Sequence, residues 1–480
     1  GFEALAATTD RNSNTALGAQ TLKTNVNGAK NTAVGSGALL TMNPATDTDT
    51  HNVAVGFDAG GDITTGVRNT LIGSLAGTVL TTGIRNVAVG FQALTTDTKG
   101  QRSVAIGHNA LSVQNFTTAT DSFNVAVGHE AGAAVTTGTR NTIVGAIAGD
   151  AFTIGFNNIA IGYDAMGANT ASGANVAVGY EAMQAYNDTN ELSRFNTAVG
   201  TQAGKALTTG VENTLIGGLA GDALTDADSN VAVGNAALGS DTLGSRSTAI
   251  GAGALNEQNF TTATNSYNTA VGFAAGNRVS TGVQNTLIGA NNGIDLLSGN
   301  YNVAVGYLAL FEDQHGSESV AVGYGALQNQ RFTTATDSFN TAVGYAAGLS
   351  NTTGTNNTFI GAEAGEANTT GANNTAVGAL ALESTTEGTN NTAVGQASLF
   401  ENTLGSKSIA VGRGTLQNQN YATATDGHNV AVGHEAGNDI TTGVQNTLVG
   451  GLSGDALTDA DYNVAIGMGT LTSDTLGSRS

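Results

Sequence analysis

A short apolar stretch that ends in glycine recurs along the whole chain, from residues 31–35 near the start to residues 463–467 near the end. The residue before this glycine is Val or Ile in 25 of 26 copies, and Leu17 is the exception. The residue before that is Ala or a larger apolar residue, and it follows Thr or Val in most copies. Because β-branched residues at this density favour extended backbone, each copy predicts a short β-strand. We call the closing glycine the marker glycine.

The spacing of the marker glycines divides the chain into rungs of two lengths. Twenty intervals are 17 residues long and six are 21, and together they span residues 1–467 without interruption. Counting the last rung, which follows Gly467, 21 rungs are short, and in 17 of them a second glycine stands ten residues after the marker. Glycine readily adopts the positive φ of sharp turns. A repeat of this kind predicts an all-β fold, a parallel β-solenoid (β-roll) with 17- and 21-residue rungs and two short strands in each rung. The six long intervals open at Gly35, Gly107, Gly179, Gly251, Gly323 and Gly412.

No linker interrupts the repeat, so the sequence predicts a single continuous β-solenoid over residues 1–480. About 27 rungs at ~4.8 Å each would give a rod roughly 130 Å long. Residues 474–480 repeat residues 241–247, which lead into a marker glycine at Gly251. We therefore expect the chain to be a fragment of a longer repeat fibre, in which another long rung follows Ser480.

Asparagine stands four residues before the marker glycine in 22 of 26 copies, and serine stands there in the other four. Asparagine suits the junction of a turn and a strand, because it tolerates left-handed backbone and bonds to nearby backbone groups. On stacked rungs the amides can form a hydrogen-bonded ladder along the solenoid axis. We expect a structural ladder and not a catalytic set, with members Asn69, Asn86, Asn141, Asn213 and Asn285.

The alternation of side chains within each strand leads to a prediction of its two faces. We expect a column of valines that precede marker glycines to point inward, with members Val127, Val199, Val271 and Val343. The residue before each of them would then point outward, and it is apolar too, whereas an exposed sheet face is usually polar. Because so long an exposed apolar stripe is rare on a monomer, we expect an interface between chains there. Its large members are Leu71, Ile143, Leu215, Leu287, Phe359 and Leu448.

The long rungs carry the candidate contact loops, because four extra residues must bulge from each of them. One interpretation is that aromatic residues such as Phe116 and Phe123 cover the edge of the solenoid. The other is a regularly spaced row that contacts a ligand or a neighbouring fibre, since loops on rigid scaffolds commonly carry function. The candidate contact residues are Phe116, Phe260, Phe332 and Tyr421.

Composition narrows the classes of function. The formal net charge of −21 argues against nucleic acid and anionic membranes as partners. The chain has no cysteine, which excludes disulfides and thiolate metal sites, and no apolar run approaches the ~20 residues of a membrane span. Only 11% of the residues are charged, as expected where like charges on stacked rungs would repel each other by about 1 kcal/mol.

Candidate chemistry is sparse. No nucleophile elbow, phosphate-binding loop or dinucleotide fingerprint occurs, so we expect no enzyme and no cofactor. His129 adjoins Glu130 and His434 adjoins Glu435, but these histidines replace the Phe or Tyr of other rungs, so we assign no metal. The sequence Thr-Asp-Ala-Asp at 225–228 returns at 458–461. Its carboxylates suit Ca²⁺, yet a turn held by aspartate hydrogen bonds is the favoured interpretation.

The pattern Asn/Ser-(Thr/Val)-Ala-(Val/Ile)-Gly-x-x-Ala, which covers the whole chain, resembles the repeat of trimeric autotransporter adhesin heads. Residues 69–83, in which Thr-Thr-Gly follows the motif, resemble phage-type tail-fibre repeats. The resemblance implies a left-handed parallel β-roll, assembly as a homotrimer, and an extracellular location on a cell surface or a virion.

These observations predict a non-enzymatic fibre shaft, a rigid spacer that supports adhesion or attachment. The first alternative is an adhesin whose long loops bind glycans or surfaces directly. The second is an ice-binding solenoid with flat rows of threonine, although Thr and Val alternate irregularly at the first strand position. The expected partners are further copies of the chain as a homotrimer, host or cell-surface glycans, and lateral fibre contacts, without nucleic acid or membrane insertion.

Overall fold

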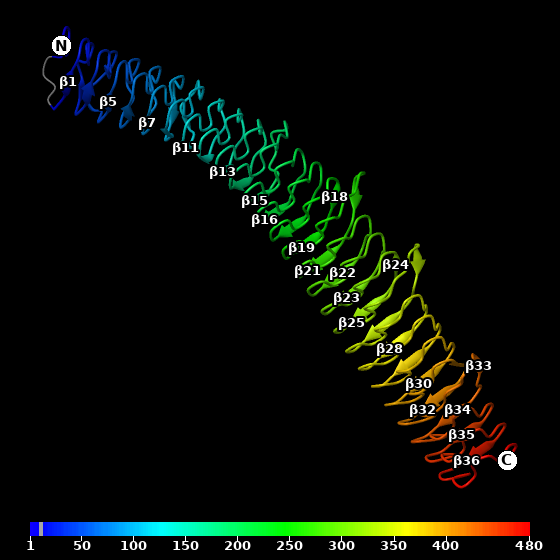
Figure 1. Cartoon of the computed structure of the whole chain (residues 1–480). Helices are drawn as coiled ribbons and strands as arrows, with labels where there is room; N and C mark the ends of the chain where they lie inside the picture. Colours follow the sequence, from blue (N-terminus) through cyan, green and yellow to red (C-terminus); the bar gives the residue numbers. More distant parts are fainter. Residues whose placement is uncertain (9–12) are drawn as a thin grey trace. The chain divides into compact units, whose positions relative to one another are not determined.

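The computed structural model describes residues 1–8 and 13–480, and these residues form an all-β structure without a helix. The chain contains two compact units, Gly1–Ala236 and Ala237–Ser480, each a stack of rungs (Figure 1). In both units a three-residue strand precedes each marker glycine after Gly1, and turns complete the rung. The predicted parallel β-solenoid with rungs of about 17 residues is therefore confirmed, and the continuity of one solenoid over residues 1–480 stays a prediction.

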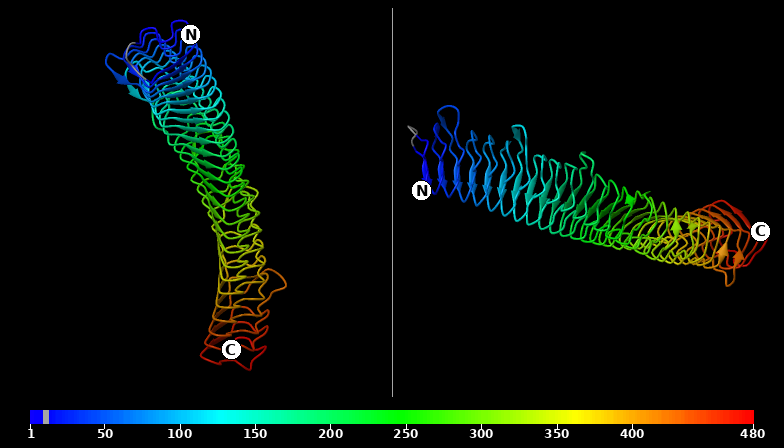
Figure 2. Two further views of the ribbon diagram at one scale, coloured as in Figure 1. Left: turned by 90° about the vertical axis from the view of Figure 1, so that its left-hand side faces the viewer. Right: turned by 90° about the horizontal axis from the view of Figure 1, so that it is seen from above.

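The first unit contains thirteen parallel strands that lie side by side, as Figure 2 shows for its blue and cyan rungs. Equivalent residues of successive rungs are paired, for example Ala54 with Leu71. The register is the same across 17- and 21-residue intervals, because the extra residues lie outside the strand. The strands are β1 (Thr15–Leu17), β3 (Thr32–Val34), β5 (Val53–Val55), β6 (Thr70–Ile72), β7 (Val87–Val89), β9 (Val104–Ile106), β11 (Val125–Val127), β12 (Thr142–Val144), β13 (Ile159–Ile161), β14 (Val176–Val178), β15 (Thr197–Val199), β16 (Thr214–Ile216) and β17 (Val231–Val233).

The second unit repeats this arrangement with thirteen further strands, in which, for example, Leu287 is paired with Ala304. The strands are β19 (Thr248–Ile250), β21 (Thr269–Val271), β22 (Thr286–Ile288), β23 (Val303–Val305), β25 (Val320–Val322), β27 (Thr341–Val343), β28 (Thr358–Ile360), β29 (Thr375–Val377), β30 (Thr392–Val394), β32 (Ile409–Val411), β34 (Val430–Val432), β35 (Thr447–Val449) and β36 (Val464–Ile466).

Among residues 1–8 and 13–480 a second strand in the rung forms only where a long rung stacks on its neighbour, so the prediction of two strands in every rung is wrong. In the first unit these two-residue pairs are β2 (Gly28–Ala29) with β4 (Thr48–Asp49) and β8 (Gly100–Gln101) with β10 (Thr120–Asp121). In the second unit they are β18 (Gly244–Ser245) with β20 (Thr264–Asn265), β24 (Gly316–Ser317) with β26 (Thr336–Asp337), and β31 (Gly405–Ser406) with β33 (Thr425–Asp426).

Elsewhere the segment after the marker glycine is a turn in which left-handed backbone recurs at alternate residues. In the rung that follows Gly90, Gln92 and Leu94 have φ values of 54° and 53° although neither is glycine. Left-handed backbone costs an L-residue roughly 1–2 kcal/mol. Bonds along the stack offset this cost, since Gln92 N–H donates to Ser74 O at 3.1 Å and Leu94 N–H donates to Ala110 O at 3.0 Å. Backbone hydrogen bonding therefore continues where the rung has no strand.

The middle residue of each strand points into the core, which reverses the predicted faces. Ala54 and Leu71 are fully buried, whereas the first and third residues of their strands are half-buried or exposed. The predicted inward column is wrong, because Val127, Val199 and Val271 are only half-buried and Val343 is 37% exposed. The predicted interface between chains is also wrong, because its members are at most 1% exposed within their own chain: Leu71, Ile143, Leu215, Leu287, Phe359 and Leu448.

Volume complementarity explains why these large residues are inside. A Cβ on Gly60 would lie 2.7 Å from Leu71 Cδ1, and a Cβ on Gly77 would lie 2.9 Å from Leu71 Cδ2. Leu71 therefore fills the space that these two turn glycines leave. Where the middle strand residue is alanine, as at Ala88, the turn position that corresponds to Gly77 holds Leu94, and both are fully buried. A large side chain from the strand or from this turn position thus fills the core at the close packing expected of protein interiors. Leu71 also fills the space of the preceding rung, where both positions are small, Ala54 and Gly60.

Candidate functional site

The outward side of the strands forms a surface of uniform chemistry in each unit. We call the first and third residues of the thirteen three-residue strands of a unit its outer face. All of these positions hold Thr, Val, Ile or Leu, and none is charged, although the chain has 16 basic and 37 acidic residues. The side chains are substantially accessible: Ile72 and Ile288, one in each unit, are both 40% exposed. The outer face is therefore an uncharged and largely apolar strip.

Aromatic side chains stand at the carboxyl ends of many of these strands, directly after the marker glycine. In the first unit the rings of Tyr163 and Tyr180 stack with their centroids 5.6 Å apart. In the second unit Tyr307, Tyr324 and Tyr345 form a continuous stack with centroid distances of 5.7 and 5.3 Å. The three are 46–55% exposed, so they add accessible aromatic surface beside the strands.

Some of the charged side chains form ion pairs at the small second sheets of the long rungs. Arg102 Nη1 lies 2.6 Å from Asp121 Oδ2, and Lys407 Nζ lies 2.6 Å from Asp426 Oδ2. Each pair joins a long rung to the one before it, so opposite charges meet where like charges would repel. The pairs are exposed and contribute little to stability. Charged side chains thus occur at the second sheets and in the turns, and none stands on the outer face.

The predicted asparagine ladder is confirmed. Asn69 Oδ1 accepts a hydrogen bond from the backbone N–H of Asn86 at 2.9 Å, and Asn69 Nδ2 donates to Gly83 O at 2.9 Å. Each buried amide thus joins its own rung to the next and also ties the strand to the turn. The same bonds are made by Asn86, Asn141, Asn213 and Asn285. This ladder is structural, because its amides are fully buried.

The prediction that aromatic residues of the long rungs form an accessible binding row is wrong. Phe116, Phe260, Phe332 and Tyr421 are only 4–6% exposed. They cover the edge of the core, which was the other interpretation. Tyr421 Oη even donates a hydrogen bond to Gly443 O at 2.9 Å. The accessible aromatic residue of the first of these loops is Phe123, which is 46% exposed and lies beneath the guanidinium of Arg102 at 5.3 Å.

Buried carboxylates lie beneath these loops. Asp97 Oδ1 accepts from Gly100 N–H at 2.9 Å and from Phe116 N–H at 3.2 Å, while Asp97 Oδ2 accepts from Gln114 Nε2 at 2.6 Å. Burial raises the pKa of the Asp97 carboxyl above its ordinary value, although these bonds oppose the shift. The sequence analysis missed this network. Its signal is an Asp or Asn followed 17 residues later by a Gln that lies inside a long interval, as in Asp97/Gln114, Asp241/Gln258, Asp313/Gln330 and Asn402/Gln419.

The aspartate turns form as expected. Asp226 Oδ1 accepts a hydrogen bond from Thr209 Oγ1 at 2.6 Å, and Asp228 Oδ1 accepts from the backbone N–H of Val211 at 2.9 Å. In the second copy Asp461 Oδ1 accepts from Val444 N–H at 2.8 Å. These carboxylates therefore bind the preceding rung, while the carbonyl groups of Ala227 and Ala460 make the contact of the usual turn glycine.

Comparison with known protein families and with curated proteins gives no match for this chain. Among residues 1–8 and 13–480 there is no helix with the length and hydropathy needed to cross a membrane. The functional conclusion therefore rests on the chemistry of the surface itself, and the outer face is its main feature.

Proposed function

We propose that the chain is a structural fibre shaft, without catalytic activity, in which copies of the chain associate through their outer faces. The observation that carries this proposal is the uncharged strip of half-buried and exposed Thr, Val and Ile side chains along the sheet of each unit. The shaft acts as a rigid spacer outside the cell or on a virion and supports adhesion or attachment. Its rigidity comes from backbone ladders and buried asparagines that join successive rungs within each unit.

The size of the outer face supports an interface between copies. Thirteen strands at a spacing of ~4.8 Å and a width of about 10 Å give a surface on the order of 600 Å² in each unit. A monomer rarely exposes a contiguous apolar patch of more than a few hundred Å². A stable protein interface buries about 800 Å² on each partner, which this strip approaches in one unit alone.

A second copy of the chain is the partner that fits this surface best. Its side chains repeat at the same rung spacing, so Val and Ile of one copy can pack between those of another along the full strip. Neither surface has a charge that would have to be desolvated. Around a fibre axis two or more copies satisfy this packing, and the resemblance to adhesin heads and tail fibres favours a homotrimer.

The role of the outer face can be tested by placing one charge on it in each unit. The Ile216→Lys/Ile288→Lys variant changes two exposed third-position residues, whereas Thr117→Lys/Thr334→Lys places the same charges on exposed loops of long rungs. Light scattering should show an oligomer for the wild type and for the loop variant, and a smaller species for the outer-face variant. A monomeric wild-type chain at micromolar concentration, or an outer-face variant that assembles as well as the wild type, contradicts the proposal.

A further inference from the structure

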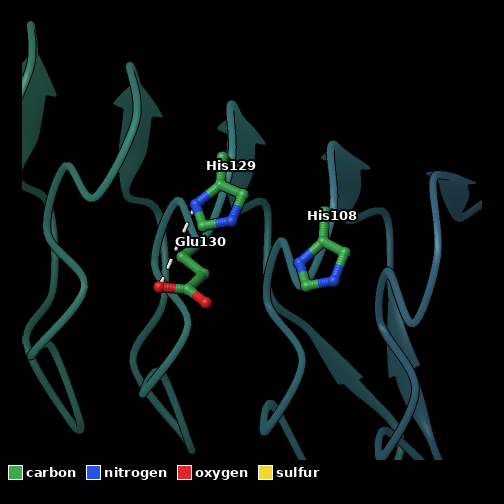
Figure 3. Close-up of side chains that lie close together, drawn as sticks. All are labelled: His108, His129 and Glu130. Atoms are coloured by element: carbon green, nitrogen blue, oxygen red, sulfur yellow. Dashed lines mark ion pairs between the residues drawn. The ribbon is translucent and has the colours of Figure 1, made fainter.

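His108, His129 and Glu130 form a cluster on the surface of the first unit (Figure 3). His108 and His129 each follow a marker glycine on adjacent rungs, and Glu130 is the next residue after His129. One ligand atom from each side chain lies within 4.8 Å of the other two. The two imidazole rings are stacked, with centroids 5.1 Å apart and an angle of 8° between their planes.

The backbone holds these three positions in a fixed relation. Glu130 N–H donates to His108 O at 2.8 Å, so the first and third residues of the cluster are joined by a hydrogen bond between rungs. The ring of Phe91 stacks on His108 with a centroid distance of 5.4 Å. Both histidine side chains are exposed, so their rings can rotate while the main chain stays in place. The cluster thus combines a rigid scaffold with adaptable ligands.

The same three positions recur in the second unit, where an arginine replaces the first histidine. Arg413, His434 and Glu435 follow their marker glycines as His108, His129 and Glu130 do. Arg413 Nη1 lies 3.1 Å from Glu435 Oε1 and 3.3 Å from His434 Nε2. In that unit a guanidinium therefore places a positive charge between the imidazole and the carboxylate.

In the described part of the first unit, no lysine or arginine is paired with the corresponding carboxylate. Among residues 1–8 and 13–480, no Lys or Arg makes an ion pair with Glu130, and His129 Nδ1 lies 4.0 Å from Glu130 Oε2. Further carboxylates lie nearby. Burial raises the pKa of Asp150, and the negative charges of Asp164 and Glu130 raise it further. The surroundings of Glu130 therefore favour a cation.

We propose that His108, His129 and Glu130 bind a divalent transition metal ion such as Zn²⁺. In the second unit, the guanidinium of Arg413 supplies the positive charge that the metal ion would supply in the first. Imidazole and carboxylate are preferred ligands of Zn²⁺, and two nitrogens with one oxygen leave a fourth tetrahedral position for water. Ligand atoms around tetrahedral zinc lie about 3.3 Å apart, so they must approach one another by at most about 1.5 Å. Rotation of the exposed rings provides this movement. The inference does not depend on self-association through the outer face.

Calorimetric titration of the whole, untagged chain with ZnCl₂ tests the site. The wild type should bind one Zn²⁺ per chain. His108→Arg, which copies the second unit, should bind Zn²⁺ with an affinity lower by roughly 100-fold or more, because one of the three ligands is replaced by a cation. Arg413→His, which copies the first unit, should bind two Zn²⁺ per chain. His428→Ala removes an exposed histidine outside the cluster and should still bind one.

Titration with Co²⁺ adds a readout of the ligands, since the wild type should show visible absorption bands of a tetrahedral ion that His108→Arg lacks. Circular dichroism should show the same fold for both, because arginine already occupies this position in the second unit. The proposal is overturned by a wild-type chain that binds no Zn²⁺, by unchanged binding in His108→Arg, or by Arg413→His that gains no second equivalent.

Discussion

The packing of Leu71 between two turn glycines predicts a compensating pair of substitutions. Leu71→Ala removes a fully buried side chain and should cost about 3 kcal/mol of local stability. Gly77→Leu adds a side chain whose Cβ would lie 2.9 Å from Leu71 Cδ2. Overpacking should cost about 1–3 kcal/mol, and the φ of 56° at Gly77 adds roughly 1 kcal/mol for a residue with a Cβ.

The double variant Leu71→Ala/Gly77→Leu should recover most of this loss. With the small side chain in the strand and the large one in the turn, the rung has the arrangement that the next rung already has with Ala88 and Leu94. Leu94 adopts φ of 53°, so leucine is compatible with the backbone of this turn. We expect the double variant to lose only about 1–2 kcal/mol, so the two substitutions should be coupled by at least about 3 kcal/mol.

Amide hydrogen exchange of the full chain, followed by mass spectrometry of peptides that cover residues 52–95, measures local stability in these rungs. Both single variants should exchange faster there than the wild type, and the double variant should approach it. Thr82→Ser changes an exposed turn residue of the same region and is the matched control, with little effect expected. Purely additive losses in the double variant, or a Leu71→Ala variant that exchanges like the wild type, would refute this account of the core.

Three further predictions concern the polar network and the long rungs. Burial raises the folded-state pKa of Asp313 above its unfolded value, so the protein gains stability from this group as pH falls through the folded pKa, and at neutral pH the charged carboxylate is unfavourable. In urea unfolding, the free energy of unfolding of Asp313→Asn should therefore exceed that of the wild type most strongly near pH 7, and this difference should shrink toward pH 4. A difference that grows as the pH falls would contradict the burial argument. Asn141→Ala leaves Gly155 O and the N–H of Asn158 without their partner and should cost about 2–4 kcal/mol in thermal unfolding, whereas an unchanged midpoint would show that water replaces both bonds. Phe332→Ala should make its long rung more susceptible to limited proteolysis, because a side chain that is only 6% exposed covers the core there, and equal cleavage of the two proteins would argue against that role.

The amino-acid sequence by itself determined the rung. The marker glycines set its length, β-branched residues before them set the strand, and asparagine four residues earlier set the ladder. These features are local, since each depends on the φ preference of a residue or on a hydrogen bond to the equivalent residue of the next rung. For this reason the strand before each marker glycine, its parallel pairing and the role of residues such as Asn141 can be predicted from the sequence.

Only the tertiary structure decided which side of the strand is the inside. Alternation separates Leu71 from Ile72 onto opposite faces, but both are apolar, so the pattern alone does not say which one is buried. The decision depends on volumes contributed by other segments: Gly60 and Gly77 leave the space that Leu71 fills, and Ile72 has no such partner and stays 40% exposed. The same holds for Phe116, whose burial follows from how the long rung packs over its neighbours. Burial depends on what packs against a side chain, and here those partners come from the turns and the adjacent rungs.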